Sequence, residues 1–444
     1  MAGAREFPRA DLVVIGAGIV GVSTALCLRK AGRDVLLIDH EAPGAGASRG
    51  NAGAFAFSDV VPLATPGILR AAPKWLLDPT GPLSIPPAYL PVIAPWLLRF
   101  WRASWRDRFP RLMAAQAALM ALSRAALERQ IEATGGEALM LRQGQLRLWQ
   151  GAGAFAARGR GYLEACRAHG IRCDLLDSPG AIAEIQPGLA PSFTHACHTP
   201  DWINTRDPLD WLHHLFAAYR ARGGRFERFA ARALEVEGRT VVIRGAGRDL
   251  RASGVVVAAG AWSRTLARSL GEALPLETER GYNTTLPAEA FDLRTHLTFA
   301  DHGFVVSRAG GCIRVGGGVE LGGLRRPPDF RRARVMLHKA ARFLPGLATG
   351  EGREWMGFRP SMPDSLPVIG PSSRAPAVFH AFGHGHLGLT QAAATAEILR
   401  DLILGRRPEI DIDAFSVDRF RKEPALKHLA TIASRNDLSL PDRG

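Results

Sequence analysis

The stretch from Asp11 to Asp39 constrains the fold of this chain more strongly than any other feature. It opens with the run Leu12 to Ile15, whose apolar side chains are typical of a buried strand. Glycines in the spacing GxGxxG follow directly, at positions 16, 18 and 21. Residues Val20 to Ala31 then have the composition of a helix, and Gly32 stands where a C-cap is expected. The sequence therefore predicts a strand, a glycine-rich turn and a helix.

Each of the three glycines has its own physical role in such a turn. Gly16 permits the tight turn out of the strand, Gly18 lets a pyrophosphate approach the backbone, and Gly21 lets the helix pack closely. The N-terminus of the helix adds free N–H groups and a partial positive charge. The alternative is a glycine-rich turn that binds nothing.

A second strand and an acidic residue complete the pattern. Residues Val35 to Ile38 form another apolar run, and Asp39 ends it. About twenty residues after the glycines is the position where a carboxylate binds ribose hydroxyls. The whole stretch therefore predicts dinucleotide binding.

Length and charge limit the remaining possibilities. The 444 residues exceed a typical single core, so we expect two domains. The formal net charge is +14, but the basic residues are mostly scattered arginines with short doublets such as Arg325-Arg326. Because no basic stripe is interleaved with aromatic residues, nucleic acid is not an expected partner. A basic surface is compatible with acidic substrates or anionic lipid.

Cysteine usage indicates a reducing compartment. The five cysteines are odd in number and form no CxxC pair, so we expect free thiols. His195, Cys197 and His198 stand close together, but no second cluster accompanies them, so we expect no metal. Residues Met1 to Ala10 lack the apolar core of a signal peptide. We therefore expect a cytoplasmic protein, either free or peripheral on the cytosolic face of the inner membrane.

Small residues dominate the segment that follows the second strand. Pro43 to Gly53 contains four glycines and three alanines, which is typical of a loop. Such a loop can wrap a ligand with backbone donors, and Ser48, Arg49 and Asn51 can add side-chain hydrogen bonds. A plain flexible linker is the alternative.

Residues Val61 to Arg108 are rich in proline, tryptophan and arginine. The prolines predict that no long helix begins before Trp96. No run of 18 apolar residues occurs, so this segment does not span a bilayer. Tryptophan and arginine mixed with aliphatic residues are typical of a segment that contacts a membrane surface. The alternative is simply the start of a second domain. The tryptophans are Trp75, Trp96, Trp101 and Trp105.

The rest of the chain alternates between expected helices and strands. One buried strand, at residues 254–257, ends in small residues and is expected to return to the nucleotide site. The turn from Gly383 to Thr390 leads into a helix, which gives a second set of free N–H groups. Helices are expected at 109–134, 158–169, 208–221 and 391–404. Strands are expected at 141–149, 225–229, 233–237, 240–244, 254–257, 276–286, 298–307, 312–319 and 378–382.

Five motifs in this order resemble the FAD-dependent D-amino-acid oxidase superfamily, which includes glycine oxidase and sarcosine oxidase. The likeness runs from about Asp11 to about Phe420 and is greatest to the small-subunit type of bacterial D-amino-acid dehydrogenase. The motifs are GxGxxG with Asp39, the loop ending Ser48-Arg-Gly-Asn-Ala-Gly53, Val257-Ala-Ala-Gly-Ala-Trp262, Gly357-Phe-Arg-Pro360 with residues 364–370, and the turn 383–390.

The resemblance implies an α/β (α+β) fold in which a Rossmann-like FAD-binding domain carries an inserted substrate domain on a mixed or antiparallel sheet. The FAD-binding domain would comprise residues 1–62, 205–270 and 355–444. The substrate domain would comprise residues 63–204 and 271–354. Relatives with covalent flavin attach it through His or Cys, and neither occurs between Glu41 and Phe57, so non-covalent FAD is implied.

The resemblance also implies where FAD binds. The pyrophosphate would lie at the first glycines and the ribose at Asp39. The flavin ring would lie near the loop 48–53 and the turn 384–390. The implied cofactor-binding residues are Gly16, Ala17, Gly18, Ile19, Val20, Gly21, Asp39, His40, Ser48, Arg49, Asn51, Ala52, Gly53, Ala259, Gly260, Trp262, His384, Gly385, Leu387, Gly388, Leu389 and Thr390.

Three residues are implied for the substrate. Arg359 matches the arginine that binds the substrate carboxylate in glycine oxidase-like relatives, and its planar fork suits a carboxylate. Tyr282 would hydrogen-bond the carboxylate or cover the site. His386 stands beside the flavin, where glycine oxidases carry an arginine. Arg280 and His302 are weaker candidates.

The activity implied is FAD-dependent oxidative deamination of a D-amino acid, with cyclic ones such as D-proline derivatives among the candidates. Hydride would pass from Cα to flavin, the imine would be hydrolysed to a 2-oxo acid or released, and the electrons would go to a quinone or another carrier. One alternative is a glycine- or sarcosine-type oxidase that makes hydrogen peroxide. Others are a nicotinamide-dependent dehydrogenase and a non-catalytic flavoprotein subunit of a larger complex.

Overall fold

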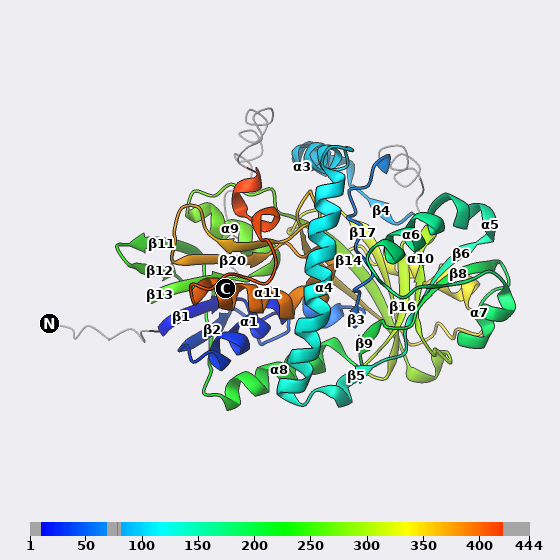
Figure 1. The fold of residues 1–444 in the computed structure, drawn as a ribbon, viewed down its shortest axis with the longest axis horizontal. Helices are drawn as coiled ribbons and strands as arrows, with labels where there is room; N and C mark the ends of the chain where they lie inside the picture. Colours follow the sequence, from blue (N-terminus) through cyan, green and yellow to red (C-terminus); the bar gives the residue numbers. More distant parts are fainter. Residues whose placement is uncertain (1–9, 69–77, 79–80, 421–444) are drawn as a thin grey trace.

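The computed structural model describes residues 10–68, 78 and 81–420. In this part the chain forms two large sheets side by side, with helix α4 (Phe109–Thr134) running across the face of the molecule between them (Figure 1). Trp75, the N-terminal residues 1–9 and the expected domain segment 421–444 lie outside the described residues.

The first sheet is built around the predicted dinucleotide unit. Strand β1 pairs in parallel with β2 on one side and with β13 on the other, so the expected return strand lies beside the first one. β20 extends the parallel part next to β13, and β11 and β12 form an antiparallel hairpin at the edge. The path order is β10 (Arg225–Arg228), β2 (Val35–Asp39), β1 (Ala10–Ile15), β13 (Asp249–Val257), β12 (Thr240–Arg244) and β11 (Ala233–Glu237), with β20 (Val378–Phe382) beside β13 and β19 (Val368–Pro371) beside β20.

Helices cover both faces of this sheet because its parallel strands are apolar on both sides. On one face α1 (Ile19–Lys30) packs against α11 (Gly388–Ile403) and α8 (Pro208–Ala221), and α11 packs against α4. Their apolar side chains form one continuous core with β1 and β2. On the other face lies α9 (Ser263–Ser269).

The second sheet is mixed and mainly antiparallel. β15 pairs in parallel with β6, and β4 (Leu83–Ser84) pairs in parallel with β17. Helix α10 (Arg331–Phe343) packs against β14 and β17. The order is β18 (Arg353–Ser361), β14 (Glu277–Leu286), β17 (Cys312–Glu320), β16 (Phe304–Ala309), β15 (His296–Phe299), β6 (Gln145–Gln150), β8 (Phe193–Thr199) and β7 (Asp174–Leu176).

Smaller elements connect the two sheets. A short three-stranded sheet joins the segment that follows the loop 43–53 to segments adjoining β6 and β8 of the second sheet. Its strands are β3 (Ala54–Phe55), β9 (Ile203–Thr205) and β5 (Met140–Leu141). The remaining helices are α3 (Leu90–Ala103), α5 (Gly151–Ala154), α6 (Arg160–Ala168) and α7 (Pro179–Ile185).

The predicted α/β fold with a second, mixed sheet is confirmed. The expected elements α4, α8, β11, β12 and β20 have the predicted limits. The domain limits stay predictions. We propose that the last boundary falls after Ser361 rather than at residue 355, because β18 pairs along its length with β14 of the second sheet.

Three expectations about secondary structure were wrong. The strand expected at 298–307 is a hairpin, because a turn ending at Gly303 (φ 66°) separates β15 from β16. Gly144 (φ 68°) likewise divides the strand expected at 141–149. Helix α3 begins at Leu90 and contains Pro95. Pro91 fits because first-turn N–H groups need no partner, and the helix continues despite the bond that Pro95 cannot make.

Within residues 10–68, 78 and 81–420, none of the helices combines the length and the apolar character that crossing a membrane requires.

Candidate functional site

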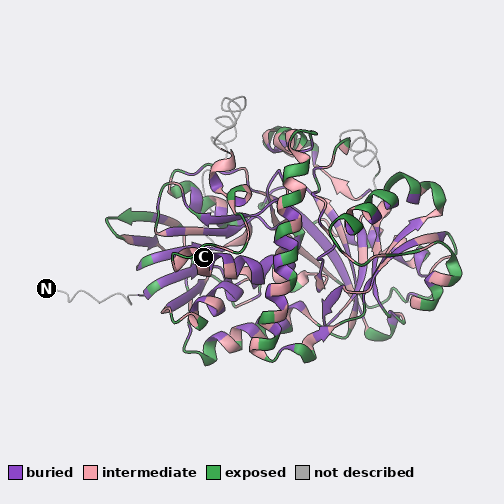
Figure 2. Cartoon of the chain, viewed as in Figure 1, coloured by how far each residue is buried: buried purple, intermediate pink, exposed green. Residues whose placement is uncertain are grey.

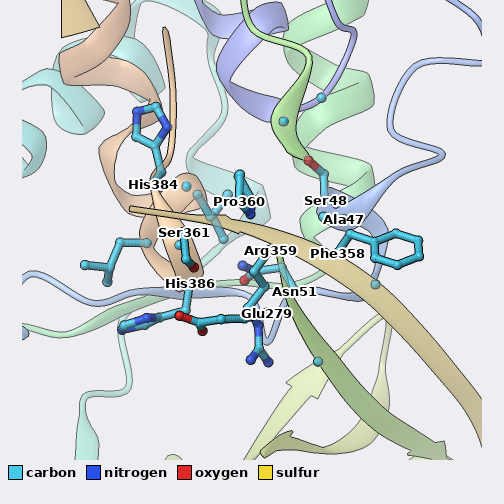
Figure 3. Close-up of a pocket in the computed structure, with 18 of the residues that line it drawn as sticks. Ala47, Ser48, Asn51, Glu279, Phe358, Arg359, Pro360, Ser361, His384 and His386 are labelled. Carbon is cyan, nitrogen blue, oxygen red and sulfur yellow. The ribbon is translucent and has the colours of Figure 1, made fainter. Parts of the chain in front are cut away.

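A cavity of about 1320 Å³ is lined by residues of both large sheets. The carboxyl ends of β1, β2 and β13 form one end of it, where ligands bind in open parallel sheets. Strands β14, β17 and β18 form the other end, and Figure 3 shows the polar side chains that meet there. The cavity therefore extends from the predicted dinucleotide site on the first sheet to the predicted substrate site on the second sheet.

The glycine-rich turn at the first end is shaped for a close ligand. Gly16 has φ 110°, and a Cβ there would lie 2.3 Å from the Ala258 carbonyl oxygen. A Cβ at Gly21 would lie 1.8 Å from the Gly16 carbonyl oxygen, so the protein itself requires both glycines. At Gly18 a Cβ would meet only the Ser48 Oγ, at 3.4 Å. The space over Gly18 is thus left open at the N-terminus of α1, which is where a pyrophosphate would lie.

Asp39 braces this turn from the end of β2. Its Oδ2 accepts a hydrogen bond from the Ala17 N–H at 2.6 Å, and its Oδ1 accepts one from Glu41 N–H at 3.1 Å. Burial alone would raise the pKa of Asp39, but hydrogen bonds from His40, Ala17 and Glu41 lower it below its usual value. The hydrogen bond to Asp39 raises the pKa of His40 in turn. The carboxylate is therefore ionised and borders the cavity where a ribose would lie.

The loop that carries Ser48 and Asn51 is held by the second sheet. The Arg314 guanidinium on β17 donates to the Asn51 carbonyl, and the Asn283 amide on β14 donates to the Gly50 carbonyl at 3.0 Å. Within the loop, the Asn51 side chain accepts a hydrogen bond from the Gly53 N–H. Strands β14 and β17 of the second sheet thus fix the main chain of the loop.

The ring of Trp355 packs over this loop and requires glycine on both sides. A Cβ at Gly50 would lie 2.0 Å from the ring, and a Cβ at Gly357 would also lie 2.0 Å from it. Ser48 reaches the other way, because its Oγ accepts a hydrogen bond from the Ile19 N–H at 3.0 Å. The loop therefore joins the start of α1 to β18.

The turn before α11 places two histidines differently. His384 is buried and its Nε2 lies 3.0 Å from the Thr395 Oγ1. Burial lowers the pKa of His384 to about 3. His386 instead faces the cavity, as Figure 3 shows. Loss of solvent around the His386 ring inside the protein lowers its pKa, although the charges of Asp59 and Glu279 oppose this shift.

Most of the cofactor-binding residues expected from the sequence line this cavity. Among the described residues, the expected ones that do not line it are Gly21, Arg49, Gly53 and Thr390. Gly21 serves helix packing, and Thr390 accepts a hydrogen bond from the Ala56 N–H at 3.0 Å. Arg49 is exposed. Gly21, Gly53 and Thr390 thus contribute to the packing and hydrogen bonding of the turn and loop.

Arg359 lies at the substrate end and is pre-positioned by a glycine. Its guanidinium packs over Gly281 so closely that a Cβ there would lie 2.4 Å from the Arg359 Cζ. Its Nη1 donates to the Gly318 carbonyl at 3.1 Å, and the side chain is half-buried. Burial lowers the pKa of Arg359, and Glu279 opposes the shift. A guanidinium stays charged in proteins, so its other N–H groups can receive a carboxylate.

Of the two roles expected for Tyr282, a hydrogen bond from its hydroxyl to a substrate carboxylate does not fit the structure, whereas covering the site stays a prediction. Its hydroxyl donates to the Glu320 Oε2 at 2.5 Å and accepts from the Asp329 N–H at 3.1 Å. Arg280 forms an ion pair with the same Glu320 at 3.1 Å. Strand alternation explains this, because Glu279 and Gly281 face the cavity while the side chains between and after them point to the other face. Tyr282 borders the cavity, but its hydroxyl is not available to a substrate carboxylate.

His302 was also expected near the substrate, and the structure places it elsewhere. Its Nε2 lies 2.9 Å from the Gln150 Oε1, and its ring packs beside Phe343. It is not among the described residues that line the cavity.

Sequence reasoning missed a second polar group in the cavity wall. The Arg147 Nη2 lies 2.5 Å from the Asp59 Oδ1, and its guanidinium stacks 4.2 Å from the Tyr162 ring centroid. His296 is nearby and buried, and burial together with Arg147 lowers its pKa to about 3. These residues are scattered over 238 positions, from 59 to 296, in no recognisable spacing, so no local signal identifies them. Glu279, on β14, was missed for the same reason.

No group of three or more metal-binding side chains is present in the part of the chain that the structure describes. The cavity offers a ligand glycine-rich backbone at one end and, at the other, the guanidinium of Arg359, most of whose N–H groups have no partner within the described residues.

Comparisons with known proteins agree with this geometry. The family described as FAD dependent oxidoreductase (DAO) matches residues 11–402. A D-amino-acid oxidase of Bradyrhizobium diazoefficiens is 33% identical over 424 residues, which cover 92% of this chain and 98% of that protein. D-amino acid dehydrogenase 2 of Ralstonia nicotianae is 34% identical over 430 residues, covering 92% of this chain and 100% of that protein.

Solved structures share the fold. Glycine oxidase from Geobacillus kaustophilus superposes with a TM-score of 0.74 at 20% identity, covering 93% of this chain and 99% of that one. L-proline dehydrogenase from P. horikoshii superposes with a TM-score of 0.69 at 19% identity, covering 93% and 98%. At such identities the likeness establishes the arrangement of the sheets and leaves the substrate open.

Proposed function

Since the chain belongs to the family of FAD-dependent oxidoreductases, we propose that it oxidises D-amino acids to imines, which hydrolyse to 2-oxo acids. FAD is the cofactor of this family, and the cavity fits it. The open space over Gly18, the carboxylate of Asp39 and the fixed loop at Asn51 suit a pyrophosphate, a ribose and a ring system in that order. Bound FAD supplies the acceptor for the hydride that leaves the substrate carbon.

The observation that carries the proposal is the free guanidinium of Arg359. It faces the cavity, and within residues 10–68, 78 and 81–420 its guanidinium hydrogen-bonds only to the Gly318 carbonyl, so most of its donors are uncommitted. An amino acid brings a carboxylate that can occupy these donors, which would fix the substrate carbon in one place. His386 lies beside it with a lowered pKa, so its neutral imidazole can accept a hydrogen bond from a substrate N–H or donate one.

The proposal of D-amino acids is supported by relatives that are named D-amino-acid oxidase or dehydrogenase. The fold does not favour either configuration, because its structural neighbours include an L-amino acid deaminase and an L-proline dehydrogenase. The test is anaerobic mixing of the purified protein with D- and L-amino acids, including D-proline derivatives, while the flavin absorbance near its visible maximum is followed. Bleaching by L-amino acids alone would refute the assignment.

We propose a quinone or another carrier as the electron acceptor, because several relatives are named dehydrogenases. The competing proposal is oxygen, since one relative is named an oxidase. Substrate is added in air and in the presence of a soluble quinone analogue, and hydrogen peroxide and quinone reduction are measured together. Stoichiometric peroxide with no quinone reduction would favour the oxidase.

Helix α3 supports a further proposal, that the protein contacts the cytosolic face of an anionic membrane. Its inner residues Trp96 and Phe100 line the cavity, whereas its outer face is largely exposed (Figure 2). The exposed apolar residues on and beside it are Leu90, Val92, Leu98, Trp101 and Trp105.

Sedimentation with anionic liposomes at low salt tests this contact. The double variant Trp101→Ser with Trp105→Ser should stay in the supernatant, because aromatic side chains supply much of the interfacial affinity. The matched control is Val236→Ser, which removes an exposed apolar side chain on β11, at the edge of the first sheet and outside the cavity lining. A wild-type protein that stays wholly in the supernatant would refute the proposal.

A further inference from the structure

Glu279 is a buried carboxylate that faces the cavity near Arg359 and His386. Its side chain lies on β14 and the residue is 5% exposed. No hydrogen bond or ion pair joins its carboxylate to any side chain or amide in residues 10–68, 78 and 81–420. A buried charge is costly unless it is paired. A carboxylate kept in this position without a protein partner therefore points to a cationic ligand.

The position of Glu279 relative to Arg359 indicates which cation. The two residues are direct partners in the antiparallel pairing of β14 with β18. Side chains of such partners start only about 4.5–5.5 Å apart at Cβ. They do not form an ion pair, because the Arg359 guanidinium turns over Gly281 toward the Gly318 carbonyl. A space bounded by one negative and one positive group is left between them, and Figure 3 shows Glu279 between Arg359 and His386.

The charges of an α-amino acid match this spacing. Its carboxylate and ammonium are attached to the same carbon, so both must be received by protein groups that are close neighbours. If the cation were instead at the end of a basic substrate side chain, the acid that receives it would have to lie further from Arg359 along the cavity. The acid found there is Asp59, and its Oδ1 is already bound by Arg147 at 2.5 Å. Glu279 is therefore placed for the α-ammonium group.

We propose that Glu279 binds the α-ammonium group of the substrate and forms, with Arg359, a clamp for the amino-acid zwitterion. The inference rests on the proposed function and narrows it, because such a clamp selects amino acids over carboxylic and 2-hydroxy acids of the same shape. Glu279 acts in substrate binding, and FAD is held by other residues.

The variant Glu279→Gln tests the clamp because it keeps the shape and removes the charge. The two probes are D-alanine, which carries both charges, and propionate, which carries only the carboxylate. The dissociation constant of D-alanine comes from the concentration dependence of anaerobic flavin bleaching. That of propionate comes from competition in the same assay.

The two probes should respond in opposite directions. D-alanine should bind roughly 10- to 100-fold more weakly, since a hydrogen-bonded charge pair is lost. Propionate should bind equally well or more tightly, because a repelling carboxylate has been removed. Glu279→Asp should retain part of the D-alanine affinity. Glu354→Gln is the control, because Glu354 lies on the same strand pair but is ion-paired with Arg334 outside the cavity.

Equal weakening of both probes by Glu279→Gln would show that Glu279 only supports the structure, and unchanged D-alanine binding would show that it does not touch the ligand. Either result overturns the clamp. If no amino acid bleaches the wild-type flavin, the proposed function fails as well. If amino acids bleach the wild type and the two probes respond alike to the variant, only the clamp fails.

Discussion

Replacing Arg359 is the most informative perturbation of the proposed activity. Its guanidinium is held over Gly281 and by the Gly318 carbonyl, so its remaining N–H groups are already oriented when a carboxylate arrives. Loss of a charge-assisted, bidentate contact in such a site costs about 2–4 kcal/mol. At about 1.4 kcal/mol per decade, Arg359→Ala should lower kcat/KM roughly 30- to 1000-fold.

Two further variants refine this prediction. Arg359→Lys should recover only part of the activity, because an ammonium does not reproduce the planar fork. Gly281→Ala changes no charge, yet its Cβ would lie 2.4 Å from the Arg359 Cζ and would push the guanidinium from its place. It should therefore impair amino-acid turnover in the same direction as Arg359→Ala. All three variants should retain bound FAD, which visible absorbance measures, since the dinucleotide end of the cavity is untouched.

The decisive assay compares an amino acid with the matching amine that lacks the carboxylate. The wild type should prefer the amino acid strongly, and Arg359→Ala should remove most of that preference while leaving turnover of the amine nearly unchanged. If Arg359→Ala lowers turnover of both compounds by the same factor, the arginine does not hold the carboxylate.

Three other outcomes are expected. Gly18→Val should yield a colourless apoprotein, because the branched side chain would fill the space left open over this residue; retained yellow colour would contradict this. Acid or heat should release the flavin from the polypeptide, because residues 41–57, the loop expected beside the flavin, contain no His or Cys. Colour that stays with the precipitate would show covalent attachment. A third expectation concerns Glu272. Burial alone would raise the pKa of this carboxyl, but hydrogen bonds from His380, Ser372 and Ser373 outweigh burial and lower the pKa from 4.5 to about 2. The stability it contributes should be complete above about pH 4.5 and lost as pH falls toward 2, so Glu272→Gln should flatten urea-unfolding midpoints over that range.

Local sequence determined the elements whose signals lie within a few residues. The GxGxxG turn requires glycine wherever it occurs, so the first β-α-β unit was predictable from residues 11–39. Helix α4 was predictable to its ends, because Gly135 (φ 68°) closes an uninterrupted helical run. Arg359 was singled out because it lies in a short motif shared with a known family. The FAD cofactor and the fold class followed from the order of such motifs along the chain.

Only the tertiary structure decided which side chains meet. The pairing of β14 with β18 places Glu279 opposite Arg359, although 79 positions separate them, and the same strand turns Tyr282 away toward Glu320. A shift of one residue in that register would exchange the two faces of the strand. Register between distant strands is fixed by packing of the whole sheet, and no short segment of sequence carries it. The sequence therefore indicated the proposed cofactor end of the cavity, where a ligand would meet backbone, and singled out Arg359 at the other end. The fold alone decided which side chains surround Arg359 there.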